Sequence, residues 1–178
     1  MKFPQARAFY MYMYAHPGKK LNFMGNEIGH FREWDEKREQ DWSLLSYPAH
    51  QDFQRFMKDL NHFYLEHPAF YEKDYDPDGF RWLECEAVDR CVYAFERISE
   101  KERIAAVFNF SGIVQEDFRL KIPGAKRLCR IFPCKPSAPD GKCTPSAPAE
   151  YIIGNSNSDF TFSLPPFSAE YYLIETQG

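Results

Sequence analysis

The spacing of hydrophobic residues predicts two helices in the first part of the chain. Residues 5–15 make a compact apolar stretch that stops at His16-Pro17-Gly18, a strong helix-ending signal. From Phe53 to Tyr64, apolar side chains recur at the i, i+3, i+4, i+7 spacing of one helical stripe. Pro48 lies near the start of this second helix, and His67-Pro68 is expected to end it.

Between the two helices, Leu21–Met24 is a short apolar run that is closed by Gly25. We expect a strand here, buried on both faces as in a parallel sheet. Helix, buried strand, loop and helix is the order found in a parallel α/β fold. Because one strand cannot form a sheet, the pattern indicates part of a larger unit.

The chain changes character at the turn-rich joint "DYDPDGF", residues 74–80. Beyond it, runs rich in aromatic and β-branched residues predict about seven short strands and no helix, which favours an antiparallel sandwich. Two of the runs are separated only by "SEKE" and predict a hairpin. The predicted strands are 80–85, 91–98, 103–110, 117–122, 127–132, 159–164 and 169–175. A Pro-, Ser- and Ala-rich segment, 133–150, interrupts the series and predicts a flexible surface loop.

Composition narrows the class of protein. Of the 178 residues, 44% are hydrophobic, enough for a core, and 17% are aromatic, which suits strands and surfaces that stack on flat ligands. The net charge of −4, without a basic stripe, argues against nucleic acid as a partner. No apolar run approaches the ~20 residues of a membrane span. Residues 1–20 carry no secretory cleavage pattern, so we expect a cytoplasmic location and no membrane partner.

Five cysteines, an odd number, indicate reduced thiols rather than a disulfide framework. Cys129, Cys134 and Cys143 cluster around the Pro-rich segment, where a metal site is an alternative. Their spacing matches no zinc pattern with a C-x-x-C knuckle, and no histidine follows Cys143, so we expect no metal.

The segment "GKKLNFMGNEIGHFREWDEKREQDW" resembles the end of the catalytic barrel of the 1,4-α-glucan (glycogen) branching enzymes, in the α-amylase superfamily. In it, "FMGNE" is similar to the last barrel strand and the Gly-x-Glu that follows, and "REWDE…DW" to the loop after it. Further on, "RFMKDLNHFYLEHPAFYEKDYDPDGFRWLE" resembles the last barrel helix and the joint into a β domain. "VFNFSG" and "FSLPPFSAEYYLIE" resemble strands of that domain.

The resemblance implies an α+β chain: a helix–strand–helix remnant of the end of a (β/α)8 barrel, followed by an all-β antiparallel sandwich. We place the barrel remnant in residues 1–74 and the sandwich in residues 75–178. A full barrel takes ~250 residues. The single parallel-type strand is explained if its neighbouring strands belong to the rest of such a barrel, which would be the partner of this chain.

Barrel enzymes place their sites at the carboxyl ends of the strands. Glu27, Arg32 and Trp34 would then lie over the cleft and bind substrate, because a Trp stacks on a sugar face while carboxylates and Arg bind hydroxyls. Glu33, Asp41 and Trp42 share the loop. The alternative is that the tryptophans pack the loop down and the charges pair within it. We expect that alternative for Trp42, because Trp is usually mostly buried.

The family's reaction is retaining transglycosylation, which needs two carboxyl groups ~5.5 Å apart and no cofactor. By resemblance, the nucleophilic aspartate, the acid and the assisting aspartate come from earlier strands, the last within a His-Asp segment. No such segment precedes Ala6, and residues 1–20 contain no Asp or Glu. No catalytic residue is therefore assigned, and we expect the chain to be inactive alone.

Three functions remain in competition. The first is an inactive part of a branching enzyme acting on glycogen or amylose, and the second is a non-enzymatic glucan-binding or docking module. The third is a small enzyme that uses one of the clustered cysteines with a histidine, although no nucleophile signature surrounds these cysteines. In the first case the apolar helix faces need cover, either by folding back on the β domain or by self-association.

Overall fold

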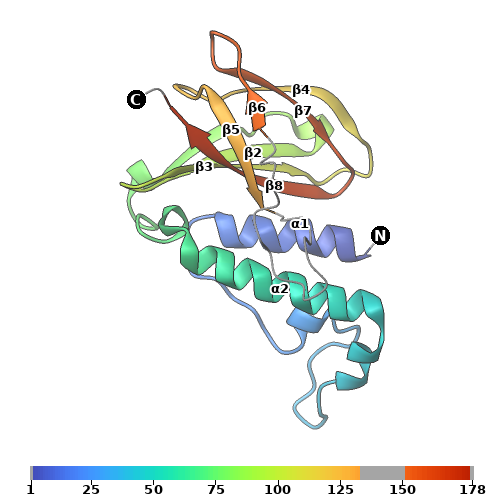
Figure 1. Cartoon of the computed structure of the whole chain (residues 1–178). Helices are drawn as coiled ribbons and strands as arrows, with labels where there is room; N and C mark the ends of the chain where they lie inside the picture. Colours follow the sequence, from blue (N-terminus) through green and yellow to red (C-terminus); the bar gives the residue numbers. More distant parts are fainter. Residues whose placement is uncertain (1, 133–150, 177–178) are drawn as a thin grey trace.

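The computed structural model describes residues 2–132 and 151–176, which form three layers (Figure 1). A pair of helices packs on one face of a six-stranded sheet, and a two-stranded sheet covers the other face. The α+β class and the antiparallel β region after the helices are confirmed. The predicted Pro-rich loop, with Cys134 and Cys143, lies outside the described residues.

Both predicted helices are confirmed. Helix α1 spans Lys2–Ala15, and helix α2 spans Pro48–Glu66 with Pro48 in its first turn. The apolar stripe of α2 is its buried face, on which Phe53 and Leu60 are fully buried. Short 3-10 turns link the longer elements: η1 (Asn26–Ile28), η2 (Trp42–Ser46), η3 (Pro68–Phe70), η4 (Pro77–Gly79) and η5 (Val88–Arg90).

All seven predicted strands are present within a few residues of the expected bounds. The strands are β1 (Phe80–Glu84), β2 (Val92–Ile98), β3 (Arg103–Asn109), β4 (Gln115–Lys121), β5 (Arg127–Phe132), β6 (Tyr151–Ile153), β7 (Asp159–Leu164) and β8 (Ser168–Glu175). The sheets run in the orders β1-β2-β3-β8-β5-β6 and β4-β7, and every pairing is antiparallel. The predicted hairpin is β2–β3, with Phe95 opposite Ala106. Strand β6 was not predicted.

The central sheet is buried on both faces because its strands alternate between two cores. On β3, Ile104, Ala106 and Phe108 point toward the helices, whereas Ala105 and Val107 point toward the β4–β7 pair. Side chains at successive positions of a strand face opposite ways, so one strand supplies both clusters.

One buried ion pair ties the helices to the sheet. Arg97 on β2 is fully buried and faces the helix side. Its guanidinium donates to the carbonyl of Ala15, the last residue of α1, at 2.8 Å. It also donates to the carboxylate of Asp74 at 2.7 Å, in the joint that follows α2. Three segments far apart in sequence therefore meet at one side chain.

The expected strand at Leu21–Met24 is wrong. These residues form no strand and pair with no other segment of residues 2–132 and 151–176. Leu21 is 73% exposed, and Phe23 and Met24 are each 49% exposed. A buried parallel strand needs neighbours on both sides, and the described residues supply none. The run is therefore an extended connection with its apolar side chains in solvent.

The helix faces that needed cover are covered by the β region. Residues Met11 and Phe63 of the two helices lie in one cluster with Phe95 and Tyr171 of the large sheet. Tyr171 also donates a hydrogen bond to the carbonyl of Met11 at 2.5 Å. Of the two alternatives, folding back on the β domain is the one observed. The boundary at residues 74 and 75 stays a prediction.

Candidate functional site

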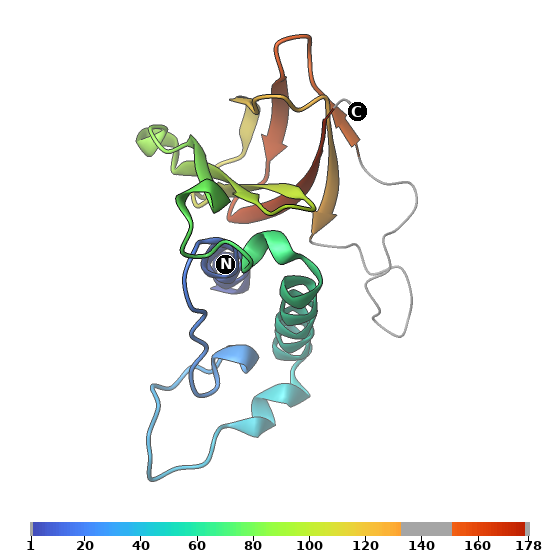
Figure 2. The same cartoon turned by 90° about the vertical axis from the view of Figure 1, so that its left-hand side faces the viewer.

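The predicted site residues lie in the candidate loop, defined as residues 21–47, which hangs from the helix pair on the side away from the strands (Figures 1 and 2). Large apolar side chains gather on it in an exposed state. Those at least 45% exposed are Leu21, Phe23, Met24, Phe31, Trp34, Trp42 and Tyr47. An exposed group of this size in one segment is typical of a binding surface.

Glu27 lies in a tight turn held by two glycines. Gly25 and Gly29 flank η1 in the left-handed region, with φ of 81° and 64°. A residue with a side chain would be strained at the φ of Gly25, and its Cβ would also lie 2.5 Å from the end of the Gln40 side chain, so the turn favours glycine there. Within the described residues the half-buried Glu27 carboxylate makes no hydrogen bond or ion pair. It is therefore free to accept hydrogen bonds from a ligand.

Arg32 is engaged inside the loop. Its Nη2 donates to Asp41 Oδ1 at 3.0 Å and to the carbonyl of Glu39 at 2.9 Å. Its Nη1 lies 4.0 Å from the carboxylate of Asp35. The hydrogen bond from Arg32 holds the pKa of the Asp41 carboxyl below its ordinary value. Arg32 therefore joins the two ends of the segment 32–41. This arrangement agrees with the alternative interpretation, in which the charged side chains of the loop pair with one another.

The side chains of Trp34 and Trp42 are exposed to a similar extent. Trp34 is 45% exposed and meets the ring of Phe23 edge-on, with centroids 5.6 Å apart. Trp42 was expected to pack the loop down, but it is 47% exposed, so that expectation is wrong. It begins η2 at the end of the loop, where the part of the chain that the structure describes offers little to cover it. Both rings present apolar surface to solvent.

Two histidines that sequence reasoning missed anchor the loop. His50 on α2 is buried, and its Nδ1 lies 2.7 Å from the carbonyl of Ile28, so Nδ1 carries the proton and donates. Its ring also meets Phe31 edge-on. His30 contacts Arg32 and Asp41. Neither histidine belongs to a spacing motif, so the sequence carries no signal for them.

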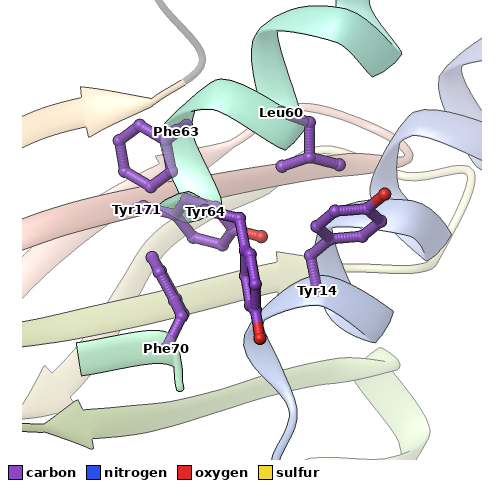
Figure 3. A pocket seen from close by; sticks show the side chains of 6 residues that line it. All are labelled: Tyr14, Leu60, Phe63, Tyr64, Phe70 and Tyr171. Carbon is purple, nitrogen blue, oxygen red and sulfur yellow. The ribbon is translucent and has the colours of Figure 1, made fainter. Parts of the chain in front are cut away.

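A small apolar pocket lies between the helices and the sheet. It is lined by apolar and aromatic side chains and has no room for a water molecule (Figure 3). Its lining is Tyr14, Leu60, Phe63, Tyr64, Phe70 and Tyr171. Because this pocket is too small for a ligand, the exposed side chains of the candidate loop remain the candidate binding surface.

Metal-binding clusters of three or more His, Cys, Asp or Glu are absent from residues 2–132 and 151–176. Cys85, Cys91 and Cys129 are free thiols there. Neither described helix is both long and apolar enough to cross a membrane.

Comparison with known proteins places the chain in a family. The family described as "Alpha amylase, C-terminal all-beta domain" matches residues 82–175. The 1,4-alpha-glucan branching enzyme GlgB of Vibrio parahaemolyticus is 40% identical over 173 residues, which are 94% of this chain and 23% of that protein. The enzyme of the same name from Aquifex aeolicus is 45% identical over 124 residues, 68% of this chain and 20% of that protein. The chain thus spans about a quarter or less of the length of these relatives.

Solved structures give the same fold. The α-amylase from Geobacillus thermoleovorans, complexed with acarbose, matches with a TM-score of 0.70 at 16% sequence identity. The match covers 100% of this chain and 34% of the α-amylase chain. At that identity the likeness concerns the fold alone. With a family match that covers more than half of its residues, this chain belongs to the alpha amylase C-terminal all-beta domain family.

Proposed function

We propose that the chain is the C-terminal part of a 1,4-α-glucan branching enzyme, and that its candidate loop binds α-glucan. The observation that carries the proposal is the set of branching-enzyme relatives, which are 34–46% identical to this chain. The reaction is the transfer of an α-1,4-glucan segment to a 6-hydroxyl, forming the α-1,6 branches of glycogen. The odd number of cysteines indicates reduced thiols, which favours a cytoplasmic location, as does the family resemblance.

The chemistry of the candidate loop supports glucan binding. Sugar rings have apolar faces and polar edges, so the exposed Trp34 and the unpaired Glu27, which lie on the same loop, are suitable contacts. Arg32 is bound within the loop, so we assign it an indirect part, that of holding the loop in shape. Trp42, which is equally exposed, joins the candidate surface.

The exposed apolar side chains of the loop fit a protein partner as well as a sugar. We propose that Leu21, Phe23 and Met24 pack against an N-terminal barrel in the complete enzyme, because a run of this kind is normally buried. Alternatively, a second copy of this chain covers the same surface. Light scattering over a range of concentrations separates them: a clean monomer throughout counts against self-association.

Affinity electrophoresis in gels with and without glycogen tests binding by the loop. We expect glycogen to retard the chain, and Trp34→Ala to reduce the retardation. Trp82→Ala is the matched control, because Trp82 is 40% exposed but lies on β1, away from the loop. If Trp82→Ala reduces the retardation and Trp34→Ala does not, the alternative of a binding module in the β-sandwich is favoured. No retardation at all refutes glucan binding by this chain.

Iodine staining of amylose tests the absence of catalysis. The reaction needs two carboxyl groups ~5.5 Å apart on either side of the bond, and none of the carboxylates here is assigned to that role. Incubation with the chain alone should leave the stain unchanged. A shift of the absorbance to shorter wavelength would mean that the chain branches amylose by itself, contrary to the proposal.

A further inference from the structure

His30 occupies the base of the candidate loop in a fixed orientation. Its side chain is only 4% exposed. Nδ1 lies 2.7 Å from the carbonyl oxygen of Arg32. A carbonyl oxygen only accepts hydrogen bonds, so Nδ1 carries a proton in either charge state of the ring.

The other ring nitrogen faces two groups of one residue. Nε2 lies 3.2 Å from the backbone nitrogen of Asp41 and 3.0 Å from its carboxylate oxygen Oδ2. A neutral ring can accept from the N–H but then turns a lone pair toward the carboxylate. A protonated ring can donate to the carboxylate but gives up the N–H. The two contacts exclude each other, so the charge of His30 decides which one is made.

The same carboxylate joins both ends of the loop segment. Asp41 accepts from Arg32 as well, at 3.0 Å, and Arg32 also reaches the Asp35 carboxylate. The turn that contains Gly25 lies against the Cβ of His30 and carries the Glu27 carboxylate, and Lys2 of α1 donates to the carbonyl of Gly29, next to His30. In the described residues the charged side chain that contacts the ring is that of Asp41, and Arg32 is joined to the ring through Asp41. Asp41 therefore links His30 to both ends of the segment 32–41, which carries Trp34.

We propose that His30 is a positioning residue for glucan binding: the charge of its ring sets the contact with Asp41 and, through it, the orientation of Trp34 on the loop surface. The part that concerns glucan rests on the proposed function above. No ligand touches His30 in this scheme, since its ring is buried.

Fluorine NMR of the whole chain labelled with 5-fluorotryptophan tests the proposal. Single Trp→Phe variants assign the three resonances, and the Trp82 resonance reports on the integrity of the fold. In a pH titration, the Trp34 resonance should shift together with the ring-nitrogen resonances of His30. In His30→Gln, which keeps a donor but has no charge change, the shift should vanish. His62→Gln is the matched control, because His62 lies exposed on α2.

Titration calorimetry with maltoheptaose supplies the binding readout. Loss of the ring contacts in His30→Ala should weaken affinity about fivefold at pH 7, as expected for one net hydrogen bond. His30→Gln should bind within about twofold of the unsubstituted chain and lose its pH dependence. A Trp34 resonance that ignores pH, or that titrates equally in His30→Gln, overturns the positioning role. Intact coupling without maltoheptaose binding in any variant keeps that role and overturns the proposed function instead.

Discussion

Removal of the Asp74 carboxylate should cost this protein much of its stability. Asp74 pairs with Arg97 at 2.7 Å, and the two side chains are 7% and 0% exposed. In Asp74→Ala the guanidinium stays buried, because β2 holds it, but it loses the carboxylate. The carbonyl of Ala15 remains as a partner, while Nε already has none in the described residues. Breaking such a pair from one side costs about 3–5 kcal/mol, a large share of the roughly 5–15 kcal/mol of a typical domain.

Urea unfolding at pH 7, followed by tryptophan fluorescence and circular dichroism, measures this loss. Asp52→Ala is the matched control: its pair with Arg55 has a similar length, 2.8 Å, but side chains that are 57% and 47% exposed. An exposed pair is screened by water, so we expect a change within about 0.5 kcal/mol. The apolar double variant Asp74→Leu, Arg97→Met should recover most of the lost stability, because no unpaired charge is left inside.

The reasoning fails if Asp74→Ala and Asp52→Ala lose equal stability. That result would mean that water or a backbone shift compensates Arg97, and that the pair does not hold the helices to the sheet. Failure of the double variant to recover would refute only the claim that the loss comes from an unpaired charge.

Three further outcomes are expected. Gly25→Ala should cost about 1–2 kcal/mol by thermal unfolding, because a side chain at φ 81° is strained and its Cβ meets Gln40; an unchanged melting temperature would contradict this. Asn109 is fully buried and donates to the carbonyls of three residues, so Asn109→Ala should cost about 1–3 kcal/mol and speed amide exchange at the end of β3; unchanged exchange would count against it. Burial lowers the pKa of Lys20 from 10.5 to about 8. Between about pH 8 and pH 10.5 the unfolded chain binds more protons at Lys20 than the folded one, so the contribution of Lys20 to stability should rise with pH over that window, and Lys20→Met should flatten that rise in urea titrations.

The local structure of the β region was predictable because its pattern is local. Alternation in segments such as "CVYAFERI" and "DFTFSL" fixes which side chains share a face, and the turns between them fix where strands end. Strand β6 escaped because three residues, Tyr151–Ile153, are too few to show a period, and they follow directly on the Pro-rich segment.

What the sequence could not supply depends on neighbours. Leu21–Met24 has the composition of a buried strand, but burial comes from partner strands, which the described residues lack. The candidate loop was predicted as a site from its residue types, which stays a prediction, and Trp34 lies 45% exposed on it. The roles of Arg32 and His30 depend on Asp41, which is 9 and 11 residues away along the chain, a separation without any motif.

The double-faced central sheet sets the size of the smallest piece that can be transplanted. On β3, Phe108 points toward the helices and Val107 points away from them. A cut between α2 and β1 would leave the Phe108 side of the sheet open to water, and a wide apolar surface of that kind promotes aggregation. Gene shuffling, in nature or in the laboratory, would therefore have to move both helices along with the strands. The unit that can be moved therefore includes α1 and α2 as well as the strands.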